Sequence, residues 1–506
     1  MSSTPPSSPA TPPSSPAPAG TTEPQAAAAP RAGLLIAVLV GAAFVVILNE
    51  TIMSVALPKL MVEFDVGAAT AQWLTTAFML TMAVVIPITG YLLTRLSLRT
   101  VFAIAMGSFL LGTLIAASAP IFSVLVLGRV VQAVGTAVML PLLFTTVLNL
   151  VPADRRGRTM GVISIVIAVA PAVGPTIGGV VLDQLSWRWM FWLVLPIAVV
   201  ATALGLSWIR NVTEPVAVPL DAPSVVLSAL GFSGLVFGLS SLGEAAEGDP
   251  LMPPWLPLVV GIASLTAFVL RQIRLGDGAL LDMRAFRTPA FSLAVALVSV
   301  SMMSLFGTLI LLPIYLQSVL GQSTLTTGLM LLPGGLVMGL LGYIVGRLFD
   351  RFGPRPLVAP GAIIACVAMW GMTTFDATTT IGTVIAWHVL LNIGLALMFS
   401  PLLTSALGAL PRRLYSHGSA IVSTMQQVAG AAGTALFITV LTRTSVAGAE
   451  SAGDPAAALA DGVHGAFTWG AVIAVIAVVG SLFVRRAPEP EADAVEVSVP
   501  ETAGTH

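Results

Sequence analysis

The sequence predicts an all-α integral membrane protein with fourteen transmembrane helices, and three observations lead to this fold class. First, 56% of the 506 residues are hydrophobic and only 9% are charged, whereas a soluble domain carries roughly 25% charged residues. Second, the apolar residues form fourteen runs of about 20 residues, the length that crosses a bilayer as a helix. Third, the arginines gather in every second loop between those runs, as they do in cytoplasmic loops.

The even number of runs places both ends of the chain on the same side of the membrane. With the N-terminus inside, 18 of the 22 basic residues lie in the inner segments. The bias of basic residues therefore predicts a multi-pass protein of the plasma membrane with both termini in the cytoplasm. The predicted spans are residues 33–57, 70–93, 99–118, 121–149, 159–182, 188–208, 222–242, 254–273, 289–319, 325–349, 357–375, 380–408, 418–442 and 464–484.

The two ends of the chain differ in composition from the apolar runs. Residues 1–32 are rich in proline, serine, threonine and alanine, and residues 485–506 are acidic. Neither segment has enough apolar surface to form a core, so we expect two disordered cytoplasmic tails.

The composition also argues against several classes of function. Cys366 is the single cysteine, and the four histidines show no metal-ligand spacing, so we expect no metal site and no cofactor. The chain has no glycine-rich phosphate loop with a lysine and no Ser/His/Asp arrangement. We therefore expect neither an enzyme nor an ATP-driven pump, and no nucleic-acid partner.

One internal repeat divides the chain. The loop after the second span reads GYLLTRLSLR at Gly90–Arg99, and the loop after the tenth reads GRLFDRFGPR at Gly346–Arg355. Glycine, leucine and two arginines recur at the same offsets, eight spans apart. This predicts two pseudo-symmetric six-helix bundles with spans 7 and 8 inserted between them, an architecture in which repeats enclose a central site. The expected units are residues 33–208, 209–288 and 289–484.

The fifth span has an unusual concentration of proline and glycine. Within the stretch Gly161–Asp183 these residues leave a smooth strip, where another helix can approach closely or slide. We expect the strip to bend and to meet the opposite half of the protein. Its members are Pro171, Gly174, Pro175, Gly178 and Gly179.

Several motifs resemble those of one known family. LNETIMSVALP at Leu48–Pro58 is similar to its first-helix motif, and LGRVVQAVGTA at Leu127–Ala137 is similar to its fourth-helix motif. The proline- and glycine-rich strip resembles the antiporter motif of the fifth helix, and SWRWMF with Pro196 matches what commonly follows it. Together these motifs resemble the fourteen-helix drug:proton antiporters of the major facilitator superfamily.

The resemblance implies a fold, a function and partners. It implies the two-bundle fold of that superfamily and a secondary transporter that expels amphipathic drugs in exchange for protons by alternating access. The implied partners are small amphipathic molecules, protons and the lipid bilayer, and we expect a monomer. Two alternatives stay open: an exporter of the same fold for one metabolite, such as a siderophore, lipid or amino acid, and a membrane scaffold or receptor that transports nothing.

Two intramembrane charges are candidates for proton coupling. Asn49 occupies the position where the family motif has an aspartate, and Glu50 stands beside it, about 100° away around the helix. Arg129 lies in the fourth span. A charged group at a helix centre costs roughly 2.5–3.5 kcal/mol on insertion, which favours a functional reason for its presence. The alternative is that Glu50 lies at the outer interface and that Arg129 ties helices together through backbone carbonyls.

The repeated loops predict a conformational latch at the inner side. Thr94 and Ser97 replace the usual aspartate and glycine in the first copy, whereas Asp350 and Gly353 keep them in the second. The arginines can pair with carboxylates such as Asp350 or with helix C-termini, and orientation of the chain alone is the alternative explanation. The predicted latch residues are Gly90, Arg95, Arg99, Gly346, Asp350, Arg351, Gly353 and Arg355.

By analogy with the superfamily, spans 1, 2, 4, 5, 9, 10, 12 and 13 line a central cavity. Amides, aromatic rings and flexible methionines there would accept varied amphipathic molecules. The alternative is that these side chains pack against other helices or face lipid. The candidates are Gln72, Trp73, Met79, Gln132, Tyr315, Gln317, Asn392, Met398, Phe399, Gln426 and Gln427.

Overall fold

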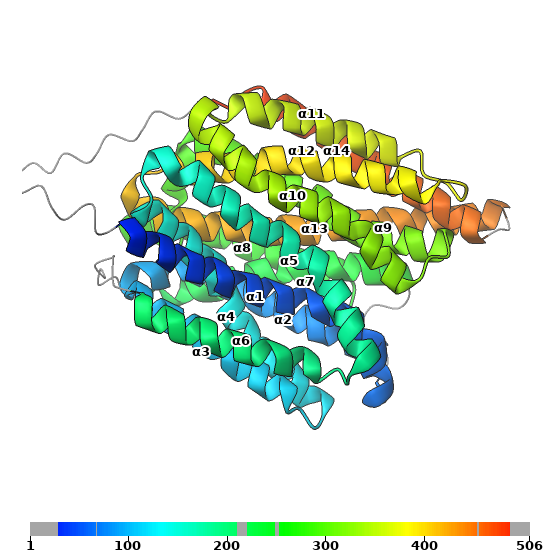
Figure 1. The fold of residues 1–506 in the computed structure, drawn as a ribbon, viewed down its shortest axis with the longest axis horizontal. Helices are drawn as coiled ribbons and strands as arrows, with labels where there is room; N and C mark the ends of the chain where they lie inside the picture. Colours follow the sequence, from blue (N-terminus) through cyan, green and yellow to red (C-terminus); the bar gives the residue numbers. More distant parts are fainter. Residues whose placement is uncertain (1–28, 67, 210–219, 248–251, 453–454, 486–506) are drawn as a thin grey trace, which may run out of the picture.

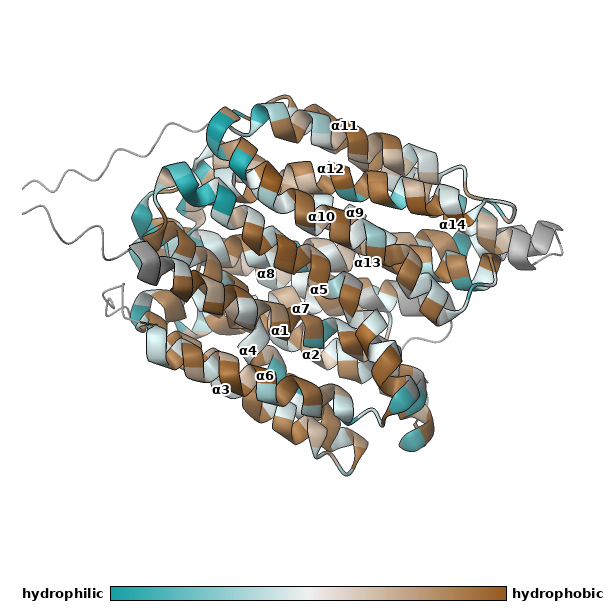
Figure 2. Cartoon of the chain, in the orientation of Figure 1, coloured by the Kyte–Doolittle hydropathy of each residue, from teal (hydrophilic) through white to brown (hydrophobic). Residues whose placement is uncertain are grey.

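The computed structural model describes residues 29–66, 68–209, 220–247, 252–452 and 455–485 of the 506-residue chain. In these residues 14 helices are long and apolar enough to cross a membrane. The predicted fold class and number of spans are therefore confirmed. Hydrophobic residues fill the middle of the bundle, and hydrophilic residues concentrate towards its two ends (Figure 2).

The first six helices form one half of the molecule and the last six form the other (Figure 1). The N-terminal half contains α1 (Ala29–Glu63), α2 (Ala68–Arg95), α3 (Leu98–Ala117), α4 (Phe122–Leu150), α5 (Arg156–Gln184) and α6 (Trp189–Trp208). The C-terminal half contains α9 (Pro289–Ile314), α10 (Thr324–Phe352), α11 (Arg355–Met372), α12 (Ile381–Gly408), α13 (Tyr415–Ala452) and α14 (Pro455–Ser481). Between the halves the chain forms α7 (Ala222–Glu247) and α8 (Trp255–Leu275).

The predicted span boundaries differ most at the ends of three helices. α1 begins at Ala29, inside the segment expected to be a tail, while residues 1–28 and 486–506 lie outside the described part. α13 continues to Ala452 and α14 already begins at Pro455. The added turns are rich in alanine, a strong helix former. Counting apolar residues cannot find such turns, because the helix continues past the hydrophobic core of the membrane.

Two helix pairs form the seam between the halves. α5 packs against α10, and α2 packs against α13 in the pseudo-symmetric position. A hydrogen bond between Thr145 Oγ1 on α4 and Ser419 Oγ on α13, 2.8 Å long, also crosses the seam. We call the end that carries the loops after α2, α4, α10 and α12 the arginine-rich end. Gly90, Gly157 and Gly346 all approach the opposite half at this end.

The inserted helices lie against the α2 and α13 side of the seam. α7 contacts α2, α13 and α8, and Trp73 on α2 stacks on Phe237 of α7 with 6.4 Å between ring centroids. Arg271 of α8 donates two hydrogen bonds of 2.7 Å to Asp221, which precedes α7. The bidentate ion pair therefore fixes the two inserted helices to each other.

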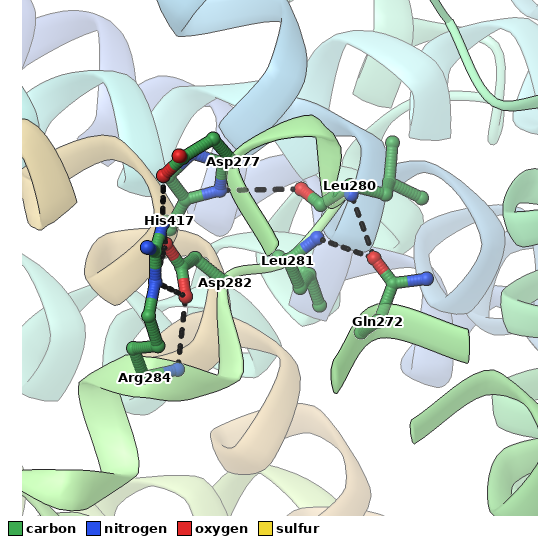
Figure 3. A network of polar contacts seen from close by, with 7 residues as sticks. All are labelled: Gln272, Asp277, Leu280, Leu281, Asp282, Arg284 and His417. Atoms are coloured by element: carbon green, nitrogen blue, oxygen red, sulfur yellow. Dashed lines mark hydrogen bonds and ion pairs between the residues drawn. The ribbon is translucent and has the colours of Figure 1, made fainter. Parts of the chain in front are cut away.

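The linker after α8 joins the inserted helices to the C-terminal half (Figure 3). Gln272 of α8 accepts hydrogen bonds from the backbone N–H groups of Leu280, at 2.6 Å, and Leu281, at 3.2 Å. The Leu280 carbonyl lies 3.3 Å from the imidazole Nδ1 of His417 on α13. Arg284 pairs with Asp282, which stiffens the same turn. The linker thus docks on the first turns of α13, where Gly90 of α2 also packs.

The Asp221 ion pair predicts an acid-dependent loss of stability. Hydrogen bonds from Arg271 hold the pKa of Asp221 well below its usual range. A carboxyl with a lowered folded-state pKa stabilises the fold above its unfolded pKa of about 3.9, and this contribution disappears as the pH falls further. Asp221→Asn should therefore lower the melting temperature by about 1 °C at neutral pH, and the difference from wild type should shrink below about pH 4. Thermal unfolding in detergent at several pH values checks this, and a difference that grows in acid would contradict it.

Candidate functional site

Two glycines of the proline- and glycine-rich strip, Gly174 and Gly178, face α1 in their own half. A Cβ atom at Gly174 would overlap Thr51 Oγ1, and one at Gly178 would lie 3.2 Å from the Ile52 carbonyl oxygen. α5 is one continuous helix through Pro171 and Pro175, although the Pro175 side chain lies outside the described ones. The expectation that the strip meets the opposite half is therefore wrong for Gly174 and Gly178, whereas Pro171 lines the cavity between the halves. The helix rotation that brings Gly174 and Gly178 to α1 could not be read from their spacing.

The contact of α5 with the opposite half uses other glycines, nearer the arginine-rich end. A Cβ atom at Gly157 would lie 2.6 Å from the carbonyl oxygen of Gly346, and one at Gly342 would lie 3.0 Å from that of Gly161. Backbone therefore packs against backbone over about one turn of each helix. This small-residue contact lets the backbones of α5 and α10 approach closely.

The strip predicts different effects for two glycines in the same motif. Gly174→Val should disrupt the α1–α5 packing and reduce transport strongly, because its side chain would overlap Thr51. Gly179→Val is the matched control, since a Cβ atom there meets no described atom within 4 Å. Transport assays on both variants at equal expression check this. Equal activity of the two would contradict the packing role.

Asp350 connects the halves at the arginine-rich end. Its two carboxylate oxygens accept hydrogen bonds of 2.8 Å each, one from the backbone N–H of Gly157 and one from that of Arg158. These amides belong to the first turn of α5, where a helix has unpaired N–H groups and a positive dipole end. A residue of the C-terminal half therefore caps a helix of the N-terminal half.

The latch arginines have other contacts. Arg95 lies over the ring of Tyr91 at 5.9 Å, and Arg351 lies over Phe352 at 5.2 Å. Arg99 and Arg355 are exposed. The expected pairing of Asp350 with an arginine side chain is thus corrected, because the backbone of α5 occupies both of its oxygens. Gly353 ends α10 with a φ of 78°, a conformation that favours glycine.

The pseudo-symmetric latch at α2 and α13 lacks the carboxylate. A Cβ atom at Gly90 would lie 3.4 Å from the Ser416 carbonyl oxygen, so the helices are close here as well. However, Thr94, at the position corresponding to Asp350, donates its hydroxyl hydrogen to Gly90 O of its own helix. The charged cap is therefore present in one of the two repeats.

Asp350→Asn should weaken closure of the arginine-rich end. An amide keeps one acceptor but loses the negative charge, so we expect a loss of about 1 kcal/mol, or roughly fivefold in the closed population. The contact between Thr145 and Ser419 supplies the readout. In a Cys366→Ser background, disulfide formation between Thr145→Cys and Ser419→Cys should decrease roughly fivefold on adding Asp350→Asn. Unchanged disulfide formation would contradict a latch role.

A cavity of about 140 Å³ lies between the halves. Residues near the middle of α4 and α5, such as Thr136 and Ala168, line it. Glu50 of α1 is the acidic residue of its lining. The other polar lining residues are Thr136, Thr308, His388, Asn392, Ser423, Gln426 and Gln427.

Asn49 and Glu50 point in different directions, which resolves their ambiguity in the sequence. Glu50 lines the cavity, while Asn49 is buried and accepts a hydrogen bond of 3.3 Å from Arg129. Arg129 also donates to Gln132 Oε1 at 2.8 Å, and its guanidinium lies 4.0 Å from the ring centroid of Phe78. Arg129 therefore connects α1, α2 and α4 through side chains rather than through backbone carbonyls. The carboxylate accessible from the cavity is that of Glu50.

Three of the predicted substrate contacts line the cavity, namely Asn392, Gln426 and Gln427. The prediction is corrected for three residues. Gln132 is completely buried. Its amide donates to Thr113 Oγ1 at 2.8 Å and accepts from Arg129, so it already has partners within the protein. Tyr315 is buried and donates to the Asp376 carbonyl at 2.7 Å, and Phe399 is buried two turns beyond Asn392.

The remaining candidates also lie elsewhere. Trp73 stacks on α7, and the Gln72 side chain lies outside the described ones. Met79, Gln317 and Met398 are absent from the cavity lining.

Reasoning from the sequence missed His388, Thr308 and Ser423 as cavity residues. Spacing could have found all three, and for two of them the partner is itself a cavity residue: His388 precedes Asn392 by four residues and Ser423 precedes Gln426 by three. Side chains at such spacings share one helix face. Thr308 follows Ser304 by four residues in α9, so spacing indicates it as well.

Comparison with known proteins identifies the family. The profile described as Major Facilitator Superfamily matches residues 39–434. The chain belongs to the major facilitator superfamily. Members of this superfamily are transporters rather than enzymes, so the two halves and the cavity between them belong to a transporter.

Several similar proteins align with this member of the superfamily over most of its length. The lincomycin resistance protein LmrB of Listeria monocytogenes is 42% identical over 458 residues, which cover 90% of this chain and 97% of that protein. LmrB of Bacillus subtilis is 39% identical and covers 88% of this chain and 94% of its own. The crystal structure of the human organic anion transporter MFSD10 matches with a TM-score of 0.64 at 15% identity, over 89% of this chain and 99% of that one. The last similarity concerns the fold alone.

Proposed function

We propose that the protein expels amphipathic, cationic or neutral drugs across the cell membrane in exchange for protons. The similarity to lincomycin resistance proteins over nearly their whole length supports drug efflux. The arginine-rich end then faces the cytoplasm together with both termini, in agreement with the usual placement of basic residues. Each chain encloses its own cavity, so a monomer suffices for transport.

The position of Glu50 is the observation that carries proton coupling. Glu50 lines the cavity, and Arg129 lies near enough to interact with it electrostatically. An ionisable carboxyl buried in a membrane protein is costly and marks a functional site by default. A proton and a cationic substrate would compete for this carboxylate, so that binding of one releases the other.

The α5–α10 contact supplies the conformational side of the proposal. Backbone packing at Gly157 and Gly346, with the Asp350 cap, would close the cytoplasmic end. Opening this contact would expose the cavity to the cytoplasm, and closing it would expose the cavity to the outside. The two halves would thus rock around a fixed site, which is the usual mechanism of alternating access in repeat transporters.

Transport in inside-out membrane vesicles tests the proposed function. Vesicles containing the protein should accumulate lincomycin or tetraphenylphosphonium when the interior is acidified, and nigericin should abolish accumulation by collapsing the pH gradient. Vesicles from cells without the protein are the control. Uptake that does not depend on the pH gradient would reject proton coupling. The absence of uptake for a panel of amphipathic drugs would reject drug efflux.

A further inference from the structure

The two walls of the cavity differ in chemistry. The N-terminal half contributes Glu50 and one hydroxyl, that of Thr136, which donates to the Gln132 carbonyl of its own helix at 3.1 Å. The rest of that wall is apolar. The C-terminal half contributes six neutral polar residues, which we call the polar wall: Thr308, His388, Asn392, Ser423, Gln426 and Gln427.

Three atoms of the polar wall have no hydrogen-bond partner among the described residues. They are Thr308 Oγ1, Ser423 Oγ and Gln426 Nε2, whose residues are 1%, 5% and 7% exposed. A buried polar atom without a partner costs roughly 1–3 kcal/mol, so native proteins retain few of them. All three residues line one cavity, which indicates that a molecule bound there supplies the missing partners.

The neighbouring residues of the polar wall are held in place. Asn392 Nδ2 donates to the His388 carbonyl at 2.8 Å, and its amide also lies 3.3 Å from the His388 ring. Gly334 of α10 makes room for both, because a Cβ atom there would lie 2.5 Å from His388 Nε2 and 2.7 Å from Asn392 Nδ2. The wall is therefore pre-organised, which reduces the entropic cost of binding a polar group.

We infer that the polar wall is a subsite for neutral hydrogen-bonding groups of the substrate, such as hydroxyls or amides. This inference rests on the proposed function, in which Glu50 binds the cationic group. Because Glu50 belongs to one half and the polar wall to the other, the favoured substrates are cationic amphiphiles whose hydroxyl or amide lies away from the charge. A purely apolar cation leaves the three unpaired atoms without partners and is bound less well.

Competition between matched cations tests the subsite. The probes are alkyltrimethylammonium ions with octyl, decyl or dodecyl chains, and the same ions with a hydroxyl at the end of the chain. Each competes with tetraphenylphosphonium uptake into proteoliposomes of the full-length protein. The quantity measured is the ratio of inhibitory concentrations within each pair, which does not depend on the absolute transport rate.

Three variants make the test specific. Thr308→Val and Gln426→Leu remove polar groups with little change in shape, and each should shift the ratio roughly fivefold towards the non-hydroxylated ion, the factor that one hydrogen bond contributes. Thr439→Val is the matched control, because Thr439 Oγ1 is also buried and unpartnered in the same half but does not line the cavity. It should keep the wild-type ratio.

The outcomes separate this inference from the proposed function. A wild-type protein that transports neither tetraphenylphosphonium nor any drug of the panel would reject the proposed function. Transport with the same ratio in all four proteins, at every chain length, would overturn the subsite, because the unpaired atoms would then not contact the substrate. A shift equally large in Thr439→Val would overturn it as well.

Discussion

Glu50→Gln should reduce proton-driven drug transport to the level of vesicles without the protein. The amide has nearly the same shape and keeps hydrogen-bonding ability, but it cannot exchange a proton in the accessible pH range. Glu50 is the acidic residue that lines the cavity, so no second carboxylate of that lining can replace it. Uptake of tetraphenylphosphonium into proteoliposomes with an imposed pH gradient measures the loss.

A control on the same helix distinguishes coupling from folding. Glu63 is the last residue of α1. It pairs with Arg188 at 2.7 Å and does not line the cavity. Glu63→Gln should retain pH-driven uptake. If Glu50→Gln also retained it, the proton would bind elsewhere, and the assignment of Glu50 would be wrong.

Gly161→Val should have the second-largest effect and prevent closure of the arginine-rich end. Any Cβ atom at Gly161 would overlap the backbone carbonyl of Gly342 on α10, and backbone cannot rotate away as a side chain can. The variant should fold, because its own helix tolerates valine, but it should fail to complete the transport cycle. Disulfide formation between Thr145→Cys and Ser419→Cys should be lost together with transport.

Gly107→Val is the control for Gly161→Val. Gly107 lies in α3 and a Cβ atom there meets nothing within 4 Å, so the same substitution adds the same volume without a clash. This variant should transport normally. If Gly161→Val also transported normally, close contact of α5 and α10 would not be required for the cycle.

The sequence predicted the membrane spans well, because the physical signals for spans are strong and local. The length of the apolar runs located all fourteen helices. It could not show the extra turns of α13 and α14, whose alanine-rich residues lie outside the apolar runs. These turns form because alanine has a high helix propensity, and hydrophobicity alone does not reveal that.

The functional site was less predictable, because it depends on helix rotation and on neighbours distant in the chain. One residue of rotation decides that Glu50 reaches the cavity while Asn49 binds Arg129. Rotation also decides that Gly174 meets α1 whereas Gly157 meets α10. The residue type alone cannot reveal that the amide nitrogen of Gln132 donates a hydrogen bond to Thr113, whereas that of Gln426 has no partner among the described residues.

Proton release on drug binding tests the central claim most directly. The purified protein, in weakly buffered detergent solution near neutral pH, receives a saturating amount of tetraphenylphosphonium while a pH indicator follows the solution. Wild-type protein should release protons and Glu50→Gln should release none, because the cation displaces the proton of that carboxyl. Equal proton release by the two proteins, or binding without release by the wild type, would contradict exchange at Glu50.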